Sequence, residues 1–581
     1  MTVLLDERVP GTLDQVTERL RDDTFRGARV EIWVFEGAAQ RRAAEERLSA
    51  AGVVARVRSA YKPLLHFFLE DVAIADLRRA TIRYPVHDAA HGRRFLVEAF
   101  PLAALLKGTD ARWLPGEAAL SYRVELEYRD RNATVHEVFA PNLVREDHLG
   151  ERTLSPTGWL RITGSRDGAG DADRPLETEF ETAFHKVIAA VGAHPWGAQE
   201  PYFEQLVIRA DIPGAEQRLP YLEECVSTAE ALHEDVYFSL LEWFKRRAGR
   251  GIDDRTTQPG QIIPDIRYAD GAARVRVALE PFRATPPPQA AVPLETADRP
   301  LSADQLAAEL SALGGRRFSA TSRQGRAVAG TYHAGTHPAI LVTAGQHANE
   351  TSGVVGALRA ARRLAATPGA HFALIPSENP DGYALHRLLC AQHPRHMHHA
   401  ARYTALGDDL QSRSHEPLYE KAARLEALQL SGAALHINLH GYPAHEWTRP
   451  MSGYLPRGFD LWAVPKGFYL ILRHHRAWAD RAAAFLARLT ERLGAAPGLA
   501  AFNRTQLETY RAHAGELSSP VYHDVPCQVV EDDRAPTPLT LITEFPDETI
   551  YGELFVFAHT VQMQTVLAAE EIHAALEPGR G

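Results

Sequence analysis

Two histidines and a glutamate in the second half of the sequence follow apolar runs of strand length. His347 and Glu350 stand three residues apart in GQHANE, directly after the run at 339–345. His440 ends a second such run, ALHINLH, and precedes a glycine. Two histidines and one carboxylate fill three positions around a zinc ion and leave the fourth open for water, as in catalytic zinc sites. A helix N-terminus with an acidic residue in its first turn also explains the His-x-x-Glu pair.

A second carboxylate, Glu544, ends the apolar run LTLITEF. Burying a carboxylate without a partner costs free energy, so we expect Glu544 to have a specific role at this position. Beside a water acidified by a metal, Glu544 could act as a general base; alternatively, it pairs with an arginine at the strand end. His436 lies in the middle of its run, and we expect it to be a hydrogen-bonded core histidine.

The elements that must position these side chains alternate between strand-like and helix-like patterns. Apolar runs at 339–345, 371–376, 434–440 and 539–545 are each bounded by helical or loop segments. This pattern predicts an α/β fold with a mixed, mainly parallel sheet flanked by helices. Functional groups in such sheets collect at the carboxyl ends of the strands.

The proline-rich segment at 281–300 predicts an extended linker. After it we expect the catalytic domain, at 301–575. Before it we expect an N-terminal α/β subdomain at 1–112 and a second accessory α/β subdomain at 113–280. The accessory region shows no nucleotide-binding fingerprint, and we expect it to restrict access to the site or to mediate homo-oligomerisation.

The composition excludes several classes of protein. Sixty-four Lys and Arg against 74 Asp and Glu give a net charge of −10, which argues against a nucleic-acid partner. The sequence shows neither an apolar window long enough to span a membrane nor a basic, apolar leader, so we expect no membrane association and a cytoplasmic location. Cys225, Cys390 and Cys527 lack the spacing of a disulfide framework or a metal site. The Ala- and Arg-rich, Lys-poor usage suggests a bacterial source.

The order of motifs in the second half resembles that of the zinc carboxypeptidases of the A/B type, the funnelins, and their deacylase relatives. The resemblance covers about half of the chain. The matching motifs are the opening strand SRQGRAVAG (322–330), the zinc motif GQHANE (345–350), NPDGY (379–383), LHGY (439–442) and EFPDETIYG (544–552).

This resemblance implies one Zn²⁺ per chain, held by the two histidines and the glutamate named first. It also implies that Glu544 is the general base. The family uses an arginine to stabilise the oxyanion. Counting from NPDG places that role on Arg395, with Arg402 as the alternative.

The sequence departs from the family where a D-x-N-R segment should grip the terminal carboxylate of the substrate. Asp409 fits, but Gln411 and Ser412 stand where Asn and Arg belong, and Arg413 comes one place late. A bidentate Arg–carboxylate pair is geometrically demanding. Arg413 is therefore a substrate-binding candidate only if the loop shifts.

Other family positions are less distinctive. The tyrosine that closes over the substrate corresponds to Tyr522, with Tyr510 as an alternative. The side-chain specificity pocket falls near Val529, which is neutral, although acidic residues follow it. The histidine-rich stretch at 393–402 could form a second metal site, but lacking a carboxylate or cysteine partner it is better explained as a polar loop lining the active site.

These observations predict a zinc metallopeptidase that hydrolyses an amide bond at or near the C-terminus of a peptide. The alternative is a zinc-dependent amidohydrolase or deacylase acting on a small acylated amino acid or a modified peptide in a biosynthetic pathway. The missing Asn-Arg pair favours that alternative. A catalytically silent binding module would need a broken ligand set, and the set is complete.

Overall fold

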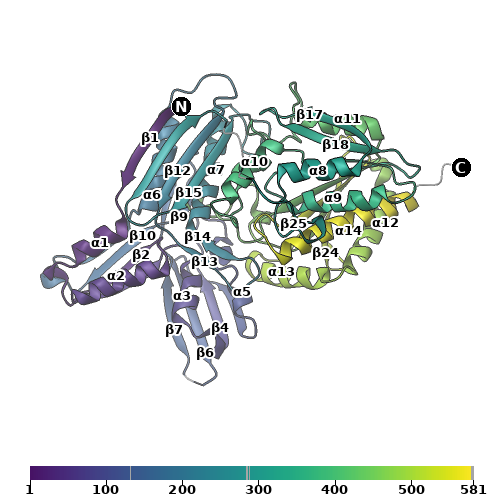
Figure 1. The fold of residues 1–581 in the computed structure, drawn as a ribbon. Helices are drawn as coiled ribbons and strands as arrows, with labels where there is room; N and C mark the ends of the chain where they lie inside the picture. Colours follow the sequence, from purple (N-terminus) through teal and green to yellow (C-terminus); the bar gives the residue numbers. More distant parts are fainter. Residues whose placement is uncertain (131, 283–285, 287, 577–581) are drawn as a thin grey trace.

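The computed structural model describes residues 1–130, 132–282, 286 and 288–576 (Figure 1). The N-terminal half builds several smaller sheets, and the C-terminal half builds one large sheet with its helices (Figure 1). No described helix combines the length and the apolar character needed to cross a lipid bilayer.

The C-terminal half contains a nine-stranded sheet within the described residues, in the order β17-β18-β20-β19-β21-β25-β22-β24-β23. Its strands are β17 (Arg316–Thr321), β18 (Ala327–His333), β19 (Ile340–Ala344), β20 (Phe372–Ile375), β21 (Leu435–Tyr442), β22 (Tyr469–His474), β23 (Val521–Tyr522), β24 (Val525–Glu531) and β25 (Leu539–Pro546). The central run β20-β19-β21-β25 is parallel, and β22 also pairs with β24 in parallel. The remaining pairs are antiparallel.

The four predicted apolar runs form β19, β20, β21 and β25, so their assignment as strands is confirmed. The sheet is mixed, as predicted. It is parallel mainly at its centre, so the description of the whole sheet as mainly parallel is not confirmed. The outer strands pair in hairpins, a connection that only antiparallel neighbours allow.

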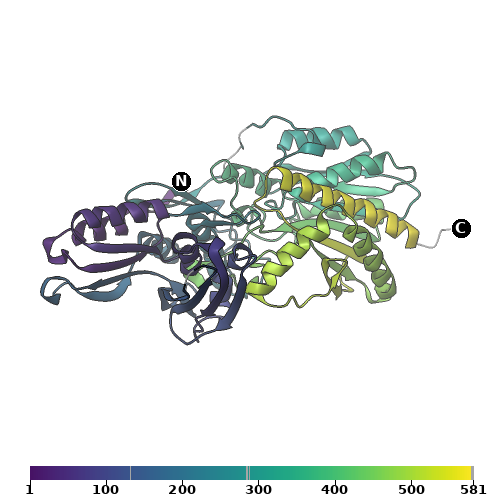
Figure 2. The same ribbon diagram turned by 90° about the horizontal axis from the view of Figure 1, so that it is seen from below.

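Helices cover both faces of this sheet (Figure 2). They are α8 (Ala303–Leu313), α9 (Ser352–Ala365), α10 (Pro380–Cys390), α11 (Lys421–Ser431), α12 (Ala479–Gly494), α13 (Leu499–Ala514) and α14 (Glu553–Leu576). Ile340 and Val342 of β19 face the core beneath α9 and α14, whereas Leu341 faces the core beneath α11. Because both faces are buried, the central strands are apolar at nearly every position.

The N-terminal half contains three four-stranded sheets among the described residues. They are β1-β16-β12-β15, β11-β10-β2-β3 and β5-β4-β6-β7. The strands are β1 (Thr2–Val9), β2 (Arg29–Val34), β3 (Val54–Ser59), β4 (Leu77–Tyr84), β5 (Asp110–Pro115), β6 (Ser121–Tyr128), β7 (Thr134–Phe139), β10 (Gly158–Thr163), β11 (Ala172–Leu176), β12 (Gln205–Ile212), β15 (Gln261–Tyr268) and β16 (Ala273–Glu280).

Two hairpins, seven α-helices and a few single-turn 3-10 helices complete the described part of this half. The hairpins are β8 (Asn142–Glu146) with β9 (Arg152–Pro156) and β13 (Glu216–Arg218) with β14 (Cys225–Ser227). The helices are α1 (Thr12–Leu20), α2 (Ala38–Ala50), α3 (Pro63–Asp71), α4 (Arg94–Glu98), α5 (Leu102–Leu105), α6 (Glu179–Ala193) and α7 (Thr228–Arg247).

The division between the two predicted accessory subdomains does not follow the strand pairing. The boundary at residues 112 and 113 falls inside β5. Strands β2 and β4 lie before it but pair with β10 and β6, which lie after it. A boundary chosen from composition cannot reveal such pairing, because it is set by contacts between distant segments.

The N-terminal half packs closely against the C-terminal half. One hydrophobic cluster unites the N-terminal sheets with Met397, Trp447 and Tyr454. Helix α7 is buried along most of its length, and its carboxylates reach across to the second half. Within the predicted linker, Leu294 and Ala297 belong to the core of the large sheet, while residues 283–285 and 287 lie outside the described residues.

Candidate metal centre and active site

The three predicted ligands come together at the carboxyl ends of β19 and β21. His347 and Glu350 lie in the loop between β19 and α9, and His440 lies near the end of β21. The loop begins at Gly345, which has a φ of 63° and whose added Cβ would lie 3.3 Å from the Cα of Ser377. A glycine is therefore needed where the chain turns out of the sheet.

One carboxylate joins the two imidazoles. Glu350 Oε1 lies 2.8 Å from His347 Nδ1, and Glu350 Oε2 lies 2.8 Å from His440 Nδ1. The two Nδ1 atoms are 3.2 Å apart, and all three side chains are buried. Ligand atoms at about 2.1 Å from one tetrahedral ion lie about 3.4 Å from each other, so this cluster needs little adjustment to hold a metal ion.

Neighbouring groups orient the candidate ligands. His347 Nε2 lies 3.4 Å from Asp409 Oδ2, which favours a proton on Nε2 and leaves the lone pair of Nδ1 directed at Glu350. Because a lone pair and a carboxylate oxygen repel each other, either a proton on Nδ1 or a metal ion must lie between them. The backbone N–H of Gly441 donates to Glu350 Oε2, and an added Cβ there would lie 1.8 Å from Asp547 Oδ1.

The pKa of each carboxyl group follows from these contacts. Burial alone would raise the pKa of Glu350, but His347, Arg402 and His440 hold that pKa well below its usual range. Burial would also raise the pKa of Asp409, and His347 again outweighs it and keeps the pKa low. Both groups are therefore carboxylates at neutral pH.

Glu544 lies directly beside His440, because the two residues are paired in the parallel register of β25 and β21. Burial raises the pKa of Glu544 well above that of an ordinary glutamate, and the charge of Glu350 raises it further. Arg402 and Lys466 oppose that shift. A carboxyl group with a raised pKa is a stronger base once it is ionised.

A cavity of about 410 Å³ opens over this cluster. Its described lining includes His347, His440 and Glu544 together with apolar and aromatic side chains from the loops around them. Those side chains include Tyr442, Trp447, Phe459, Trp462, Ile471 and Ile542. The cavity therefore has room for a peptide end or a small acylated compound beside the candidate metal ligands.

Of the two candidate oxyanion arginines, Arg402 lies at the cavity and Arg395 does not. Arg402 Nη1 is 2.7 Å from Glu350 Oε1, and Arg402 belongs to the described lining. Arg395 is absent from that described lining, and it pairs instead with Glu223 at 2.5 Å, with 43% of its side chain exposed. Arg395 does not reach the cavity, because the loop between NPDG and residue 402 packs against the N-terminal half and carries Arg395 with it.

The NPDG motif explains how Arg402 is held. Asn379 caps α10 by accepting from Gly382 N, and its amide donates to the carbonyl of Tyr403 at 3.0 Å. Asp381 accepts from Arg326 of the opening motif at 2.8 Å. Motifs far apart in the sequence are thus joined behind the site, and they fix the loop that carries Arg402.

Arg413 is buried and fully engaged, so it does not face the substrate. Its guanidinium donates to both oxygens of Asp408, at 2.6 and 2.9 Å, and to Glu420 at 2.6 Å. Gln411 and Ser412, by contrast, line the cavity. The shift of the loop that Arg413 would need in order to reach the substrate is absent from this arrangement.

A cation that the sequence did not reveal, Arg255, enters the cavity from the N-terminal half. Its Nη1 lies 3.6 Å from Asp409 Oδ2, and 44% of its side chain is exposed. Its carbonyl accepts from the backbone N–H of Asp409 at 3.0 Å, which anchors the loop between α7 and β15 to the active site. No local motif surrounds Arg255, so only the contact between distant segments identifies it.

Two other predicted positions, Tyr522 and Val529, do not belong to the described cavity lining. Tyr522 is on the edge strand β23 with 47% of its surface exposed, and Val529 is similarly exposed. His436 is buried and bonds to Thr343, as expected for a core histidine, and it also belongs to the described cavity lining.

The histidine-rich stretch at 393–402 serves mainly as packing between the two halves of the chain. His393 and His396 contact the N-terminal half through Ile266 and Ser227. Within this stretch, His399 and Arg402 belong to the described cavity lining. The prediction of a polar loop lining the active site therefore holds for only part of the stretch.

His399 carries a positive charge beside the cavity. It bonds to Glu234 at 2.5 Å and lies 3.2 Å from Glu548. Burial lowers its pKa, but the two carboxylates more than compensate and raise the pKa to about 10. His399 is therefore protonated at neutral pH.

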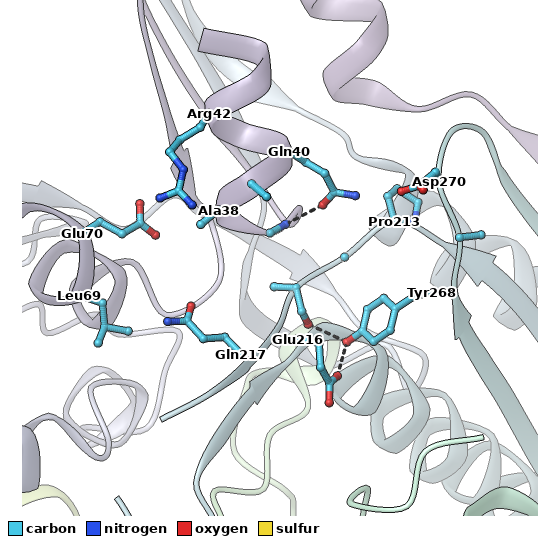
Figure 3. Close-up of a pocket in the computed structure, with 15 residues that line it drawn as sticks. Ala38, Gln40, Arg42, Leu69, Glu70, Pro213, Glu216, Gln217, Tyr268 and Asp270 are labelled. Carbon is cyan, nitrogen blue, oxygen red and sulfur yellow. Dashed lines mark hydrogen bonds between the residues drawn. The ribbon is translucent and has the colours of Figure 1, made fainter. Parts of the chain in front are cut away.

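A separate cavity of about 700 Å³ lies in the N-terminal half, between α2 and the segments around residues 213–217 and 268–270 (Figure 3). Two of the three carboxylates in its described lining are paired, Glu70 with Arg41 and Glu216 with Tyr268. Among the described residues, no cluster with the composition of a metal site lies there. The candidate active site is therefore the smaller cavity.

Comparisons with protein-family models and with curated proteins find no match. Among solved structures, the chain is similar to a metallo-carboxypeptidase from Burkholderia cenocepacia at 14% identity, covering 52% of this chain and 76% of that chain, with a TM-score of 0.29. It is similar to a metallo-carboxypeptidase from Pseudomonas aeruginosa at 17% identity, with the same coverages and a TM-score of 0.28. Carboxypeptidase A from Helicoverpa armigera shows 9% identity over 58% of this chain and 95% of that chain, with a TM-score of 0.31.

Proposed function

We propose that this chain is a zinc-dependent hydrolase that cleaves an amide bond at or near the C-terminus of a peptide. The observation that carries the proposal is the convergence of two imidazoles on one buried carboxylate, with Glu544 beside them in register. His347, Glu350 and His440 are the proposed ligands. Their nitrogen and oxygen donors suit zinc and leave one side of the ion open to the cavity.

Each remaining side chain has a role that its position supports. His347, Glu350 and His440 would hold the zinc ion, which when bound would supply Lewis-acid activation of a water and of the scissile carbonyl. Glu544 accepts the proton of the attacking water and returns it to the leaving nitrogen. Arg402 brings positive charge to the carbonyl oxygen as that oxygen becomes negative. Asp409 orients His347 from behind.

Recognition of a free C-terminus is the role that we assign to Arg255. Arg413 is paired with two buried carboxylates, so it could bind the carboxylate of a substrate only by breaking those ion pairs. Arg255 is half exposed and lines the same cavity; its guanidinium lies 3.6 Å from Asp409 and 5.7 Å from the ring centre of Phe459. In this proposal the N-terminal half completes the substrate site, which gives it a function beyond packing.

The alternative is an amidohydrolase or deacylase acting on a small acylated amino acid or a modified peptide. One observation favours it: the cavity wall carries uncharged Gln411 and Ser412 where a peptidase of the resembling family would carry its Asn-Arg pair. The two functions differ on the acyl side of the bond that is cleaved, which carries a peptide in the first case and a small acyl group in the second.

Three matched substrates separate these functions: a peptide with a free C-terminus, the same peptide as its C-terminal amide, and an N-acylated amino acid. We expect hydrolysis of the free peptide by the wild type, with little on the amide. Preferential hydrolysis of the N-acylated amino acid would favour the deacylase. If zinc-loaded protein cleaves none of the three, the proposal of a C-terminal peptidase is wrong.

A further inference from the structure

A second cluster of potential metal ligands lies at the junction of the two halves of the chain. It consists of Cys225 on β14, Glu230 in the first turn of α7 and His445 in the loop that follows β21. One donor atom from each side chain lies within 4.8 Å of the others. We propose that this cluster binds a structural zinc ion that fastens the N-terminal half to the active-site loop.

The hydrogen bonding of His445 leaves one ring nitrogen free to bind a metal ion. His445 Nδ1 lies 3.0 Å from the carbonyl oxygen of Glu446, and a carbonyl only accepts, so the proton is on Nδ1. The lone pair of Nε2 then points away from that carbonyl. Nε2 is buried and has no hydrogen-bond partner among the described residues, although Glu230 Oε2 lies 3.1 Å away. Two acceptors at this separation repel each other unless a proton or a metal ion lies between them, so the contact marks a place where a cation is held.

The carboxylate and the thiol complete the set. Glu230 Oε1 accepts from the backbone N–H of Met397 at 2.6 Å, which fixes the carboxylate and leaves Oε2 for the cluster. Cys225 Sγ lies 3.9 Å from Glu230 Oε2. Ser227 caps α7 by accepting from Glu230 N and so holds the helix start beside β14. The ligands therefore sit on elements fixed by hydrogen bonds.

The space and the charge fit a single ion. The cavity enclosed by these residues measures about 10 Å³, which is about the room that one water-sized particle needs. Glu224 and Glu446 are also buried there, and Lys62, paired with Glu446, is buried with them. The carboxylate of Glu230 is buried, and a bound metal ion would offset its charge.

The types of donor atom in this cluster indicate which metal ion it would bind. Sulfur, nitrogen and oxygen donors together suit zinc, whereas Mg²⁺ and Ca²⁺ prefer sites built from oxygen alone. Two ligands come from the N-terminal half and the third comes five residues after His440. Tyr442 and Trp447, on either side of His445, line the active-site cavity. A zinc ion here would therefore brace one wall of that cavity.

Zinc content per chain tests the proposal. The wild type should hold two zinc ions, the Cys225→Ala variant one, and the control Cys390→Ala, which removes a partly exposed cysteine elsewhere, two. His440→Ala should lose the other ion. If the wild type holds one ion that survives in Cys225→Ala, the second site does not exist. If it holds one that survives in His440→Ala and is lost in Cys225→Ala, this inference stands and the proposed catalytic site fails.

A labelling experiment on the wild type keeps the test independent of variant folding. The zinc-loaded and chelator-treated proteins are alkylated, and the modified cysteines are mapped by mass spectrometry. We expect Cys225 to be protected by zinc and modified after chelation, while Cys390 reacts equally in both samples. Equal modification of Cys225 in both samples would overturn the proposal.

Discussion

Replacing Arg255 by alanine should weaken the use of free C-termini while leaving the active site assembled. The substitution removes the guanidinium but keeps the carbonyl of residue 255, which anchors the loop to Asp409 N. A hydrogen bond between charged groups contributes about 1.5–3 kcal/mol. At about 1.4 kcal/mol for each factor of ten, the free peptide should lose about 10- to 150-fold in kcat/KM. The partial exposure of Arg255 favours the lower end.

The assay compares kcat/KM for a peptide and for its C-terminal amide in the same variant. Loss of Arg255 also removes a charge near Asp409, but that change acts through His347 and affects both substrates equally. The ratio of the two values therefore isolates recognition of the carboxylate. Arg534→Ala is the matched control, because Arg534 also lines the cavity but is 95% exposed. An equal loss on both substrates, or no loss on the free peptide, would refute the role of Arg255.

Two further predictions concern buried charges near the site. Arg413→Met leaves Asp408 and Glu420 without their partner, so the free energy of unfolding should fall by about 3–5 kcal/mol in urea denaturation; a raised KM at unchanged stability would contradict this structural role. The pKa of His399 is raised to about 10, so its stabilising contribution is complete below about pH 6.5 and is lost as the pH rises toward 10. Stability of the wild type should decline across that window by at most about 1.4 kcal/mol for each pH unit, and His399→Gln should remove that decline; an unchanged profile in the variant would show that another group is responsible.

The sequence predicted the parts of the site that depend on strand ends. His347, His440 and Glu544 follow or end apolar runs that form the parallel centre of the sheet, and parallel strands bring their carboxyl ends to one edge. Once the strands are recognised, these three side chains must lie close together. The same reasoning places Glu350, because it follows His347 in a short loop.

The rest of the site depends on loop paths, which spacing does not determine. Counting from NPDG placed the oxyanion arginine on Arg395, but the intervening loop turns to the N-terminal half and leaves Arg402 at the cavity. Arg413 looked available by position and is instead enclosed by two carboxylates. Arg255 gave no signal, because its contact joins segments more than a hundred residues apart.

The second cluster escaped the sequence for the same reason. Cys225 and Glu230 are separated from His445 by more than 200 residues of sequence, so no linear metal motif arises. The strand pairing across residues 112 and 113 is a further long-range feature. Local patterns therefore identify the strands and the ligands at their ends, whereas contacts between the two halves become visible only in the fold.

The most direct test of the central claim is anomalous diffraction at the zinc edge from crystals of the Glu544→Gln variant grown with zinc. That variant keeps all three proposed ligands and removes the proposed base. The account predicts a peak at about 2.0–2.2 Å from His347 Nδ1, His440 Nδ1 and an oxygen of Glu350. Full occupancy of zinc elsewhere with no peak among these three side chains would contradict it.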